Sequence, residues 1–454
     1  MGNVSETPRD ETPNKEERVE IPSDEAITKE EEDLLNRRPF VEHVVSLIEA
    51  NIKPPYSIGI YGDWGSGKTS IMRLIKEKLE ATGKYRIIWF DAWEYENEAN
   101  LIYPLVRLIQ KEIPRSRFKK VAKGVRKIFY VLTKAGLEVA ARLSSGDVIG
   151  IGKLEKYEAD YFKKYARVFD NWIDQVGRVK EEFKVLTQAA CEPKEKKEEK
   201  KECIIIFIDD LDRCLPENSI KILESIKNIF SQGNCIFILG VDKKTIARVI
   251  EGRYPTLTDG ECKDYLAKIV PFGFDVPECE VLDFDKYFKY LMYDKLKIDP
   301  QIIKVDLSKI PNICVSSRLH NPRKLKRALI TFYLYTKIKQ SGGFHSDLSN
   351  DMRKVGVDDQ DVLMFSLLCE FWSDLFERVL ISNHELAELT AIARNRGFRD
   401  WTTEFSDERT HPIIKNFAAD HNLYQFLWGW QNPQTDDFVN VLIRVGKLMG
   451  LRKK

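Results

Sequence analysis

The sequence predicts an α/β fold in which a parallel sheet of about five strands is covered by helices on both faces. Short apolar runs recur up to residue 275, and segments with helical spacing separate them. One of these runs leads directly into a glycine-rich loop and then a helix. Continuous apolar runs are typical of strands that are buried on both faces, as strands of parallel sheets are.

The composition is that of a folded chain with more than one domain. The 454 residues are 43% hydrophobic and 31% charged, which allows a sizeable core and excludes a wholly disordered chain. At about 150 residues per domain, the length predicts two or three domains. The net charge is +1, so the overall charge does not indicate a nucleic-acid-binding protein, although a local basic patch is compatible with it.

The sequence contains no segment with the composition of a membrane span. No apolar stretch approaches the roughly 18 residues that a spanning helix needs. The N-terminus is hydrophilic and lacks the apolar region of a signal peptide. The eight cysteines form no CxxC pair, which favours reduced, packed thiols over a zinc site or a disulfide framework. We therefore expect a soluble, cytoplasmic protein without a transmembrane span.

The predicted elements of the core begin after a leader. Residues 1–32 are rich in Glu, Lys, Pro and Ser, and we expect them to be disordered or helical. From Asp33 onward apolar residues recur at helical spacing, and a second helix is predicted over Ser70–Glu80. Strands are predicted at Tyr56–Tyr61, Arg86–Ala92, Cys203–Ile208, Cys235–Val241 and Ile269–Phe274.

The remaining segments are predicted to be helical. The segment between the second and third strands is long for one crossover, so we expect a helical insertion over about residues 97–202 of a core that spans 33–275. Beyond the core we predict a helical lid over 276–345 and a C-terminal helical domain over 346–454. The helical patterns that support them are Asp283–Lys297, Pro322–Lys337, Val362–Leu380 and Asp437–Leu451. The C-terminal aromatic residues fit packing better than a base-stacking surface.

Residues 62–69 match the phosphate-binding pattern GxxxxGK[ST]. Glycines let the backbone curl so that its N–H groups point at a phosphate, at the positive end of the following helix. Lys68 is predicted to bridge the β- and γ-phosphates, and the Thr69 hydroxyl to bind Mg²⁺. The predicted nucleotide-binding residues of this loop are Gly62, Asp63, Trp64, Gly65, Ser66, Gly67, Lys68, Thr69 and Ser70.

A second motif follows the strand at 203–208. Asp209 and Asp210 lie at its carboxyl end, where ligands bind in open α/β sheets. Asp209 is predicted to hold Mg²⁺ through water, and Asp210 to orient or deprotonate the attacking water. Without the phosphate loop, an ordinary strand followed by an acidic turn would be the better interpretation.

The order of the motifs indicates a subclass of this fold. The strand at 86–91 lies between the two motifs in the sequence, and an acidic residue follows the predicted metal ligand. Both features suggest the additional-strand P-loop ATPases, in which a strand separates the phosphate-loop strand from the metal-binding strand. Asp242 follows the strand at 235–241, where such ATPases place a polar residue beside the γ-phosphate. Capping of a helix that begins at Lys243 explains Asp242 equally well.

Six motifs occur along the chain in a single order: LNRRPFVEHV (35–44), GDWGSGKTS (62–70), FDAWEY (90–95), IDDLDRC (208–214), DYLAKIV-PF (264–272) and NPRKLKR (321–327). In this order they resemble the KAP family of P-loop NTPases. The resemblance implies an ATPase of the additional-strand division that uses ATP and Mg²⁺. Some family members take part in phage exclusion or other defence.

One segment differs from many members of the family, which insert transmembrane helices between the phosphate loop and the metal strand. The corresponding residues here, Pro114–Ile151, contain only short, interrupted apolar pieces, so the chain resembles the soluble members. Between Lys111 and Lys134 nine basic residues accompany a single acid, Glu112. This stretch is compatible with binding to nucleic acid, with an anionic membrane surface, or with a solvated helix face.

A cation at the γ-phosphate assists phosphoryl transfer. The candidates are Arg213, Arg318, Arg323 and Arg327. Arg323, in the predicted lid, is the first choice for a nucleotide sensor within the same chain. Arg213 could instead reach into a neighbouring subunit as a trans finger, which would link hydrolysis to oligomerisation. A surface or lid-to-core ion pair remains the alternative for each of them.

Together these patterns predict a Mg²⁺-dependent ATPase that acts as a molecular switch or assembly protein. The C-terminal helical region would contact a protein partner or a second copy, and a role in defence against phage follows only from the resemblance. One alternative is a nucleic-acid-stimulated motor that uses residues 111–134. Another is a nucleotide-binding scaffold without hydrolysis, which the presence of both Asp209 and Asp210 disfavours.

Overall fold

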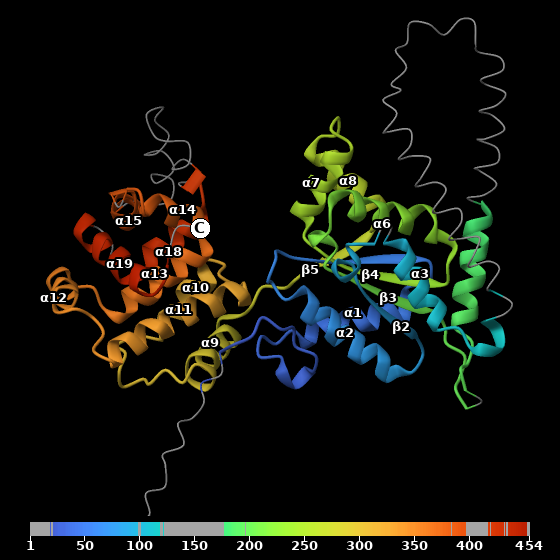
Figure 1. Cartoon of the computed structure of the whole chain (residues 1–454), viewed down its shortest axis with the longest axis horizontal. Coiled ribbons are helices and arrows are strands. Elements are labelled where there is room, and N and C mark those ends of the chain that lie inside the picture. The colour runs from blue at the N-terminus through green and yellow to red at the C-terminus, as the bar shows by residue number, and fades with distance from the viewer. Residues whose placement is uncertain are drawn as a thin grey trace, which may run out of the picture. The chain divides into compact units, whose positions relative to one another are not determined.

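The computed structural model describes residue 19 and residues 21–98, 101–118, 121, 177–195, 197–382, 384–395, 416–417, 419–430, 432 and 435–451. The chain divides into two compact units, shown in Figure 1. One unit, Ala26–Glu278, contains the sheet, and we call it the sheet unit. The other, Met1–Glu25 with Cys279–Lys454, contains only helices among its described residues, and we call it the helical unit.

A five-stranded sheet forms the centre of the sheet unit. Its strands are β1 (Tyr56–Tyr61), β2 (Arg86–Asp91), β3 (Ile204–Asp209), β4 (Cys235–Val241) and β5 (Phe272–Asp275). The strands pair in the order β2-β3-β4-β1-β5, and every pairing is parallel. The predicted fold class is confirmed. β1 and β4 have the predicted bounds, and β2 and β3 differ from theirs by at most one residue at an end. The last strand begins later than predicted, at Phe272, because residues up to Ile269 belong to the preceding helix.

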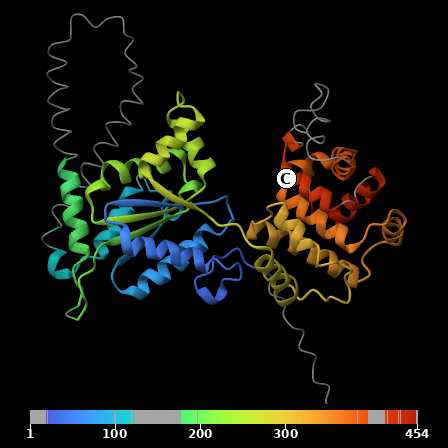
Figure 2. The ribbon, with the colours of Figure 1, turned by 180° about the vertical axis from the view of Figure 1, so that it is seen from behind.

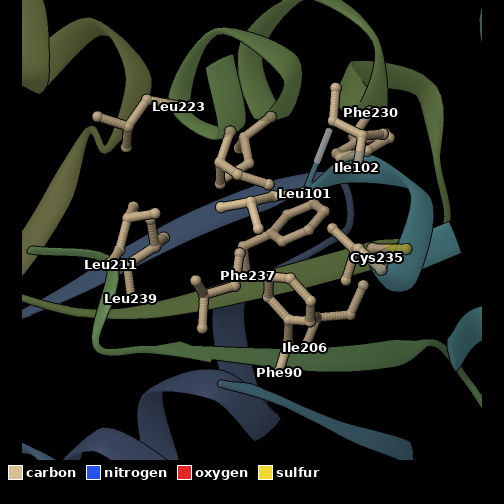
Figure 3. Packing of buried hydrophobic residues seen from close by; sticks show 14 of the residues in the cluster. Phe90, Leu101, Ile102, Ile206, Leu211, Leu223, Phe230, Cys235, Phe237 and Leu239 are labelled. Carbon is tan, nitrogen blue, oxygen red and sulfur yellow. The ribbon is translucent and has the colours of Figure 1, made fainter. Parts of the chain in front are cut away.

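Both faces of the sheet are buried, which explains the continuous apolar runs. In β3, Ile204, Ile206 and Ile208 contribute to one core cluster, and Ile205 and Phe207 contribute to the cluster on the opposite face. Figure 3 shows the first cluster, in which Phe90 and Phe237 pack beside Ile206.

Each face is covered by its own set of helices, as Figures 1 and 2 show. Helices α1 (Arg38–Asn51) and α2 (Lys68–Thr82) supply side chains to the cluster that contains Phe207. The other cluster receives side chains from α3 (Ile102–Lys111), the helix over 177–190, α6 (Pro216–Asn228), α7 (Lys243–Arg253) and α8 (Asp259–Ile269).

The strand that separates β1 from β3 is β4, whereas β2 lies at the edge of the sheet. Residues 86–91 lie between the phosphate loop and the Asp209 motif in the sequence, but in the sheet they do not lie between β1 and β3. In a parallel sheet the carboxyl ends of all strands lie on the same side of the sheet. The segments that follow β1, β2, β3 and β4 therefore converge on that side.

The helical unit contains α9 (Val281–Lys289), a π-helical segment (Tyr290–Lys295), α10 (Ile310–Ser316), α11 (Pro322–Gln340), α12 (Ser346–Val355), α13 (Asp359–Phe371), α14 (Ser373–Val379), α15 (His384–Asn395), α18 (His421–Trp430) and α19 (Asp436–Leu448). The single helix predicted over 362–380 is two helices. They are interrupted at Trp372, whose backbone is not helical and whose indole N–H donates to Asp420. The predicted boundary between a lid and a C-terminal domain stays a prediction.

Several predicted features lie partly outside the described residues. These include most of the leader, the greater part of the predicted insertion, and most of the basic segment 111–134. The leader's described end includes one short 3-10 helix, Glu30–Glu32. None of the described helices has the length and apolar composition needed to cross a membrane.

Candidate nucleotide site

The loop between β1 and α2 has a conformation that requires glycine. Gly65 and Gly67 have φ angles of 84° and 101°, which L side chains rarely adopt. A Cβ at Gly62 would lie 2.5 Å from the Ser66 hydroxyl. Gly67 is the N-cap of α2 and provides no capping side chain. The first N–H groups of this helix are therefore available to an anion.

The side chain of Lys68 is folded back onto this loop. Its ammonium group donates to the carbonyls of Gly62 at 2.9 Å and Asp63 at 3.2 Å. It also lies 3.7 Å from a carboxylate oxygen of Asp212, and only 8% of Lys68 is exposed. A positive charge is thus held at the mouth of the loop, with its position set by backbone carbonyls.

Asp209 is buried at the end of β3 and has one oxygen without a partner. Its Oδ1 accepts no hydrogen bond from any residue that the structure describes, and the same is true of the buried Ser66 hydroxyl. Burial raises the pKa of the Asp209 carboxyl, and the Thr69 hydroxyl opposes this shift. A buried carboxylate oxygen beside a hydroxyl is a donor set that suits Mg²⁺, which takes oxygen ligands.

Asp210 has a left-handed backbone conformation, with a φ angle of 53°. Burial, followed by the charge of Asp209, raises the pKa of its carboxyl to about 6, and the guanidinium of Arg213 opposes the rise. The Nε atom of Arg213 lies 2.9 Å from Oδ1 of Asp210. The predicted role of Asp210 toward an attacking water stays a prediction.

Arg213 also contacts two tryptophan rings. Its guanidinium carbon is 5.8 Å from the ring centre of Trp64 and 5.3 Å from that of Trp93, within the range of cation–π contacts. Arg213 was predicted as a cation for the γ-phosphate or as a trans finger, and that assignment stays a prediction. In this structure its side chain is engaged within its own chain.

The sequence-based assignment missed Asp212. Its Oδ2 accepts the backbone N–H of Asp242 at 3.1 Å and lies 3.7 Å from the Lys68 ammonium. Asp212 therefore connects the ends of β3 and β4 with the phosphate loop. The available signal was a third acid in IDDLDRC, on the motif's short 3-10 turn.

Asp91, at the end of β2, was missed as well. It lies beside Asp209, its register partner on the adjacent strand β3. Its Oδ1 accepts the backbone N–H groups of Trp93 and Glu94 at 3.1 and 3.3 Å. Its charge contributes to the raised pKa of both Asp209 and Asp210. An acid at the end of a buried strand was the signal that could have identified it.

Asp242 caps a helix, which was one of the two roles that the sequence left open. Its carboxylate accepts the backbone N–H of Lys244 at 2.9 Å and the hydroxyl of Thr245 at 3.1 Å. These two bonds fix the start of α7. A contact between Asp242 and the γ-phosphate stays a prediction.

The predicted sensor arginines belong to the helical unit. Nε of Arg323 lies 3.0 Å from the carboxylate of Asp24, and Nη2 of Arg327 lies 3.7 Å from the same group. Lys326, between them, donates to the carbonyl of Ser23 at 2.6 Å. The sensor role of Arg323 stays a prediction.

Two described residues of the basic segment, Glu112 and Arg117, form ion pairs. The single acid, Glu112, lies 2.6 Å from Lys194 and 3.7 Å from Arg86, and Arg117 lies 3.7 Å from Glu192. The larger part of 111–134 lies outside the described residues, so a nucleic-acid contact there stays a prediction.

Comparison with known proteins identifies similar chains. The profile of the KAP family P-loop domain matches residues 37–338. The phage T7 exclusion protein of Escherichia coli K12 is 23% identical over 258 residues, which are 54% of this chain and 33% of that protein. An uncharacterized protein of Methanocaldococcus jannaschii is 27% identical over 179 residues, which are 32% of this chain and 84% of that protein.

The matched lengths differ between these relatives. The match covers 33% of the phage T7 exclusion protein, so this chain spans about a third of that protein's length. Among solved structures, the ORC2 protein of Aeropyrum pernix, determined as ADPNP–ADP complexes, aligns over 91% of this chain and 94% of its own. The sequence identity of that alignment is 12% and its TM-score is 0.30.

Proposed function

This chain belongs to the KAP family of P-loop NTPases, and from that premise we propose that it binds ATP with Mg²⁺ and hydrolyses it as a molecular switch or assembly protein. The observation that supports hydrolysis most is the convergence of three groups at one edge of the sheet. These are the phosphate loop with Lys68, the buried Asp209 with its unpartnered oxygen, and Asp210.

Nucleotide binding is assigned to the phosphate loop. The uncapped N–H groups at the start of α2 would donate to the phosphate oxygens, and Lys68 would leave the carbonyls of Gly62 and Asp63 for the β- and γ-phosphates. We expect its pairing with Asp212 to keep the ammonium group close to the loop during this exchange.

The Thr69 hydroxyl and the Asp209 carboxylate are assigned to Mg²⁺, the latter through water. When bound, the ion neutralises charge on the phosphate oxygens. Asp209 fits this role because its buried Oδ1 has no hydrogen-bond partner in the described part of the chain and is thus open to a ligand. Ser66, whose hydroxyl is also buried and unpartnered among the described residues, fits a contact with the nucleotide phosphates.

Asp210 is assigned to the attacking water. It would accept a hydrogen bond from the water and then its proton, while the water oxygen bonds to the γ-phosphorus and the bond to the bridging oxygen breaks. The products are ADP and inorganic phosphate. Arg323 is assigned as the sensor of the γ-phosphate, which rests on the family resemblance of NPRKLKR.

We assign partner contact to the helical unit, because a switch needs a surface that responds to the state of its nucleotide. The name of the phage T7 exclusion protein suggests phage defence as the setting, and only the part of that protein covered by this chain carries the similarity. Stimulation by nucleic acid through residues 111–134 is the alternative that the experiment below distinguishes.

The test measures phosphate release by the purified chain with Mg²⁺ and ATP or GTP, with and without DNA. We expect turnover with ATP that is lost in Lys68→Ala and kept in Lys84→Ala, an exposed lysine paired with Glu49 on the same unit. Retained turnover in Lys68→Ala would contradict the assigned site. Strong stimulation by DNA that falls as salt is raised would favour the motor alternative.

A further inference from the structure

Segments that follow three different strands of the sheet meet around one guanidinium group. Trp64 lies in the phosphate loop after β1, Trp93 follows β2, and Arg213 follows β3. The rings of the two tryptophans lie 5.8 and 5.3 Å from the guanidinium carbon. The two tryptophans and Arg213 come from different crossovers, so they are brought together only by the folding of the sheet.

Core packing does not account for the two tryptophans. Trp64 is 55% exposed and Trp93 is 54% exposed, whereas large aromatic side chains are usually well buried. Among the described residues, both rings contact Arg213, whose own side chain is 29% exposed. Two rings in contact with a planar guanidinium restrict its rotation and shield part of it from water.

The restrained guanidinium in turn contacts Asp210. Its Nε atom lies 2.9 Å from the carboxylate, and the backbone N–H of Arg213 donates to the carbonyl of Asp210 at 3.2 Å. Asp210 itself has a left-handed backbone conformation, which is uncommon for a residue other than glycine. The ion pair with Nε of Arg213 restrains the direction of this carboxylate.

We propose that Trp64 and Trp93 form a clamp on Arg213, and that Arg213 acts within its own chain as a positioning residue for Asp210. The inference rests on the proposed function, because it assigns a role toward the water-activating carboxylate. It differs from a trans finger, in which Arg213 would leave this pocket and reach the nucleotide of another copy.

The clamp also connects Asp210 to the phosphate loop. Trp64 is flanked by Asp63, whose carbonyl accepts from Lys68 at 3.2 Å, and by Gly65, whose φ angle is 84°. When Lys68 exchanges this carbonyl for a phosphate, the loop segment that carries Trp64 loses one of its contacts. The position of the ring beside Arg213 then depends on the state of the loop.

Trp93→Ala is the sharpest test, because Trp93 lies outside the phosphate loop. Its turnover number and its affinity for ATP are measured together with those of Trp93→Phe, Arg213→Lys and Trp428→Ala. The last variant removes a tryptophan of the helical unit that is 50% exposed. We expect kcat to fall about tenfold or more in Trp93→Ala and Arg213→Lys, since small misplacements of a reacting group are costly. ATP affinity should stay within about twofold, because neither group is assigned to binding.

Trp93→Phe, which keeps an aromatic ring on Arg213, should recover most of the lost turnover, and Trp428→Ala should match the wild type. Unchanged kcat in Trp93→Ala, or a parallel loss of ATP affinity, would overturn the inference. Recovery of turnover on mixing Arg213→Ala with Lys68→Ala chains would also overturn it, because that result requires a trans finger. A wild-type chain without turnover would contradict the proposed function, and the inference with it.

Discussion

The carboxylate of Asp209, at the end of β3, affects both the stability of the fold and the proposed function. Asp209 is 3% exposed and has an oxygen without a partner among the described residues. A buried carboxylate of this kind is costly in the folded state, because burial removes its hydration while Oδ1 gains no hydrogen bond from the described residues. We interpret that cost as the consequence of keeping a ligand position ready for Mg²⁺.

Replacement of this carboxylate should therefore separate stability from activity. We predict that Asp209→Asn raises the free energy of unfolding by about 1 kcal/mol, since it removes a buried charge. The same variant should lose Mg²⁺-dependent turnover by about 100-fold or more, because a metal ligand is removed. Chemical denaturation and phosphate release measure the two effects. A less stable variant with normal turnover would contradict this account of Asp209.

Asp361 in the helical unit is a buried carboxylate that, unlike Asp209, accepts hydrogen bonds at both of its oxygens. It accepts hydrogen bonds from the indole N–H of Trp430 at 3.0 Å, from Asn432 at 2.8 Å and from the backbone N–H of Asp358 at 3.0 Å. Burial nevertheless raises the pKa of its carboxyl to about 6, and the three hydrogen bonds only reduce the shift.

A raised pKa in the folded state predicts how stability depends on pH. The protonated folded form is favoured, so this contribution is complete below the unfolded pKa of about 4 and is lost as pH rises through about 6. We predict that the stability difference between wild type and Asp361→Asn shifts against the wild type by on the order of 2 kcal/mol between pH 4.5 and 7. Urea unfolding across this range measures it. A constant difference would show that Asp361 does not titrate there.

At the scale of elements, helix α2 has a glycine with positive φ at each end. Gly67, with φ of 101°, begins the helix at the phosphate loop, and Gly83, with φ of 66°, ends it at the opposite side. A Cβ at either position would meet no atom within 4 Å, so the cost of alanine arises from the backbone alone.

The two glycines form a matched pair for a mutational test. We predict that Gly67→Ala and Gly83→Ala each lower the free energy of unfolding by about 1–2 kcal/mol. Only Gly67→Ala should weaken ATP binding, because the N–H groups of the phosphate loop lie at that end of the helix. Thermal unfolding and equilibrium titration with nucleotide measure both quantities. Equal losses of affinity in the two variants would show that general destabilisation is responsible.

The elements of the sheet could be predicted because each buried strand has a local signature. The run Cys203–Ile208 is apolar at every position, and β3 is buried along its whole length. The order of strands could not be predicted in the same way. Residues 86–91 lie between the two motifs in sequence, yet β4 lies between β1 and β3 in the sheet, because pairing is decided by contacts distant in sequence.

The same distinction applies to the candidate site. The phosphate loop was recognisable because its glycines and Lys68 are adjacent in the sequence. The clamp on Arg213 and the pairing of Lys68 with Asp212 involve residues from separate crossovers, so no local pattern indicates them. The cap formed by Asp242 was predictable only as one of two roles, because both need an acid at a strand end.

The molecule as a whole contains a KAP family P-loop domain and a helical unit. The family profile spans residues 37–338 and therefore extends from the sheet unit into α11, which carries Arg323. Apart from the sensor Arg323, the residues assigned to phosphate binding, Mg²⁺ and water activation belong to the sheet unit. The central claim is therefore that this unit hydrolyses ATP and does not merely bind it.

The measurement that tests this claim most directly compares ATP affinity with phosphate release in the wild type and Asp210→Asn. Asparagine keeps the size of the side chain and cannot accept the proton of the attacking water. The account predicts unchanged affinity within about twofold and a loss of turnover of about 100-fold or more. Turnover in Asp210→Asn equal to that of the wild type would contradict the account.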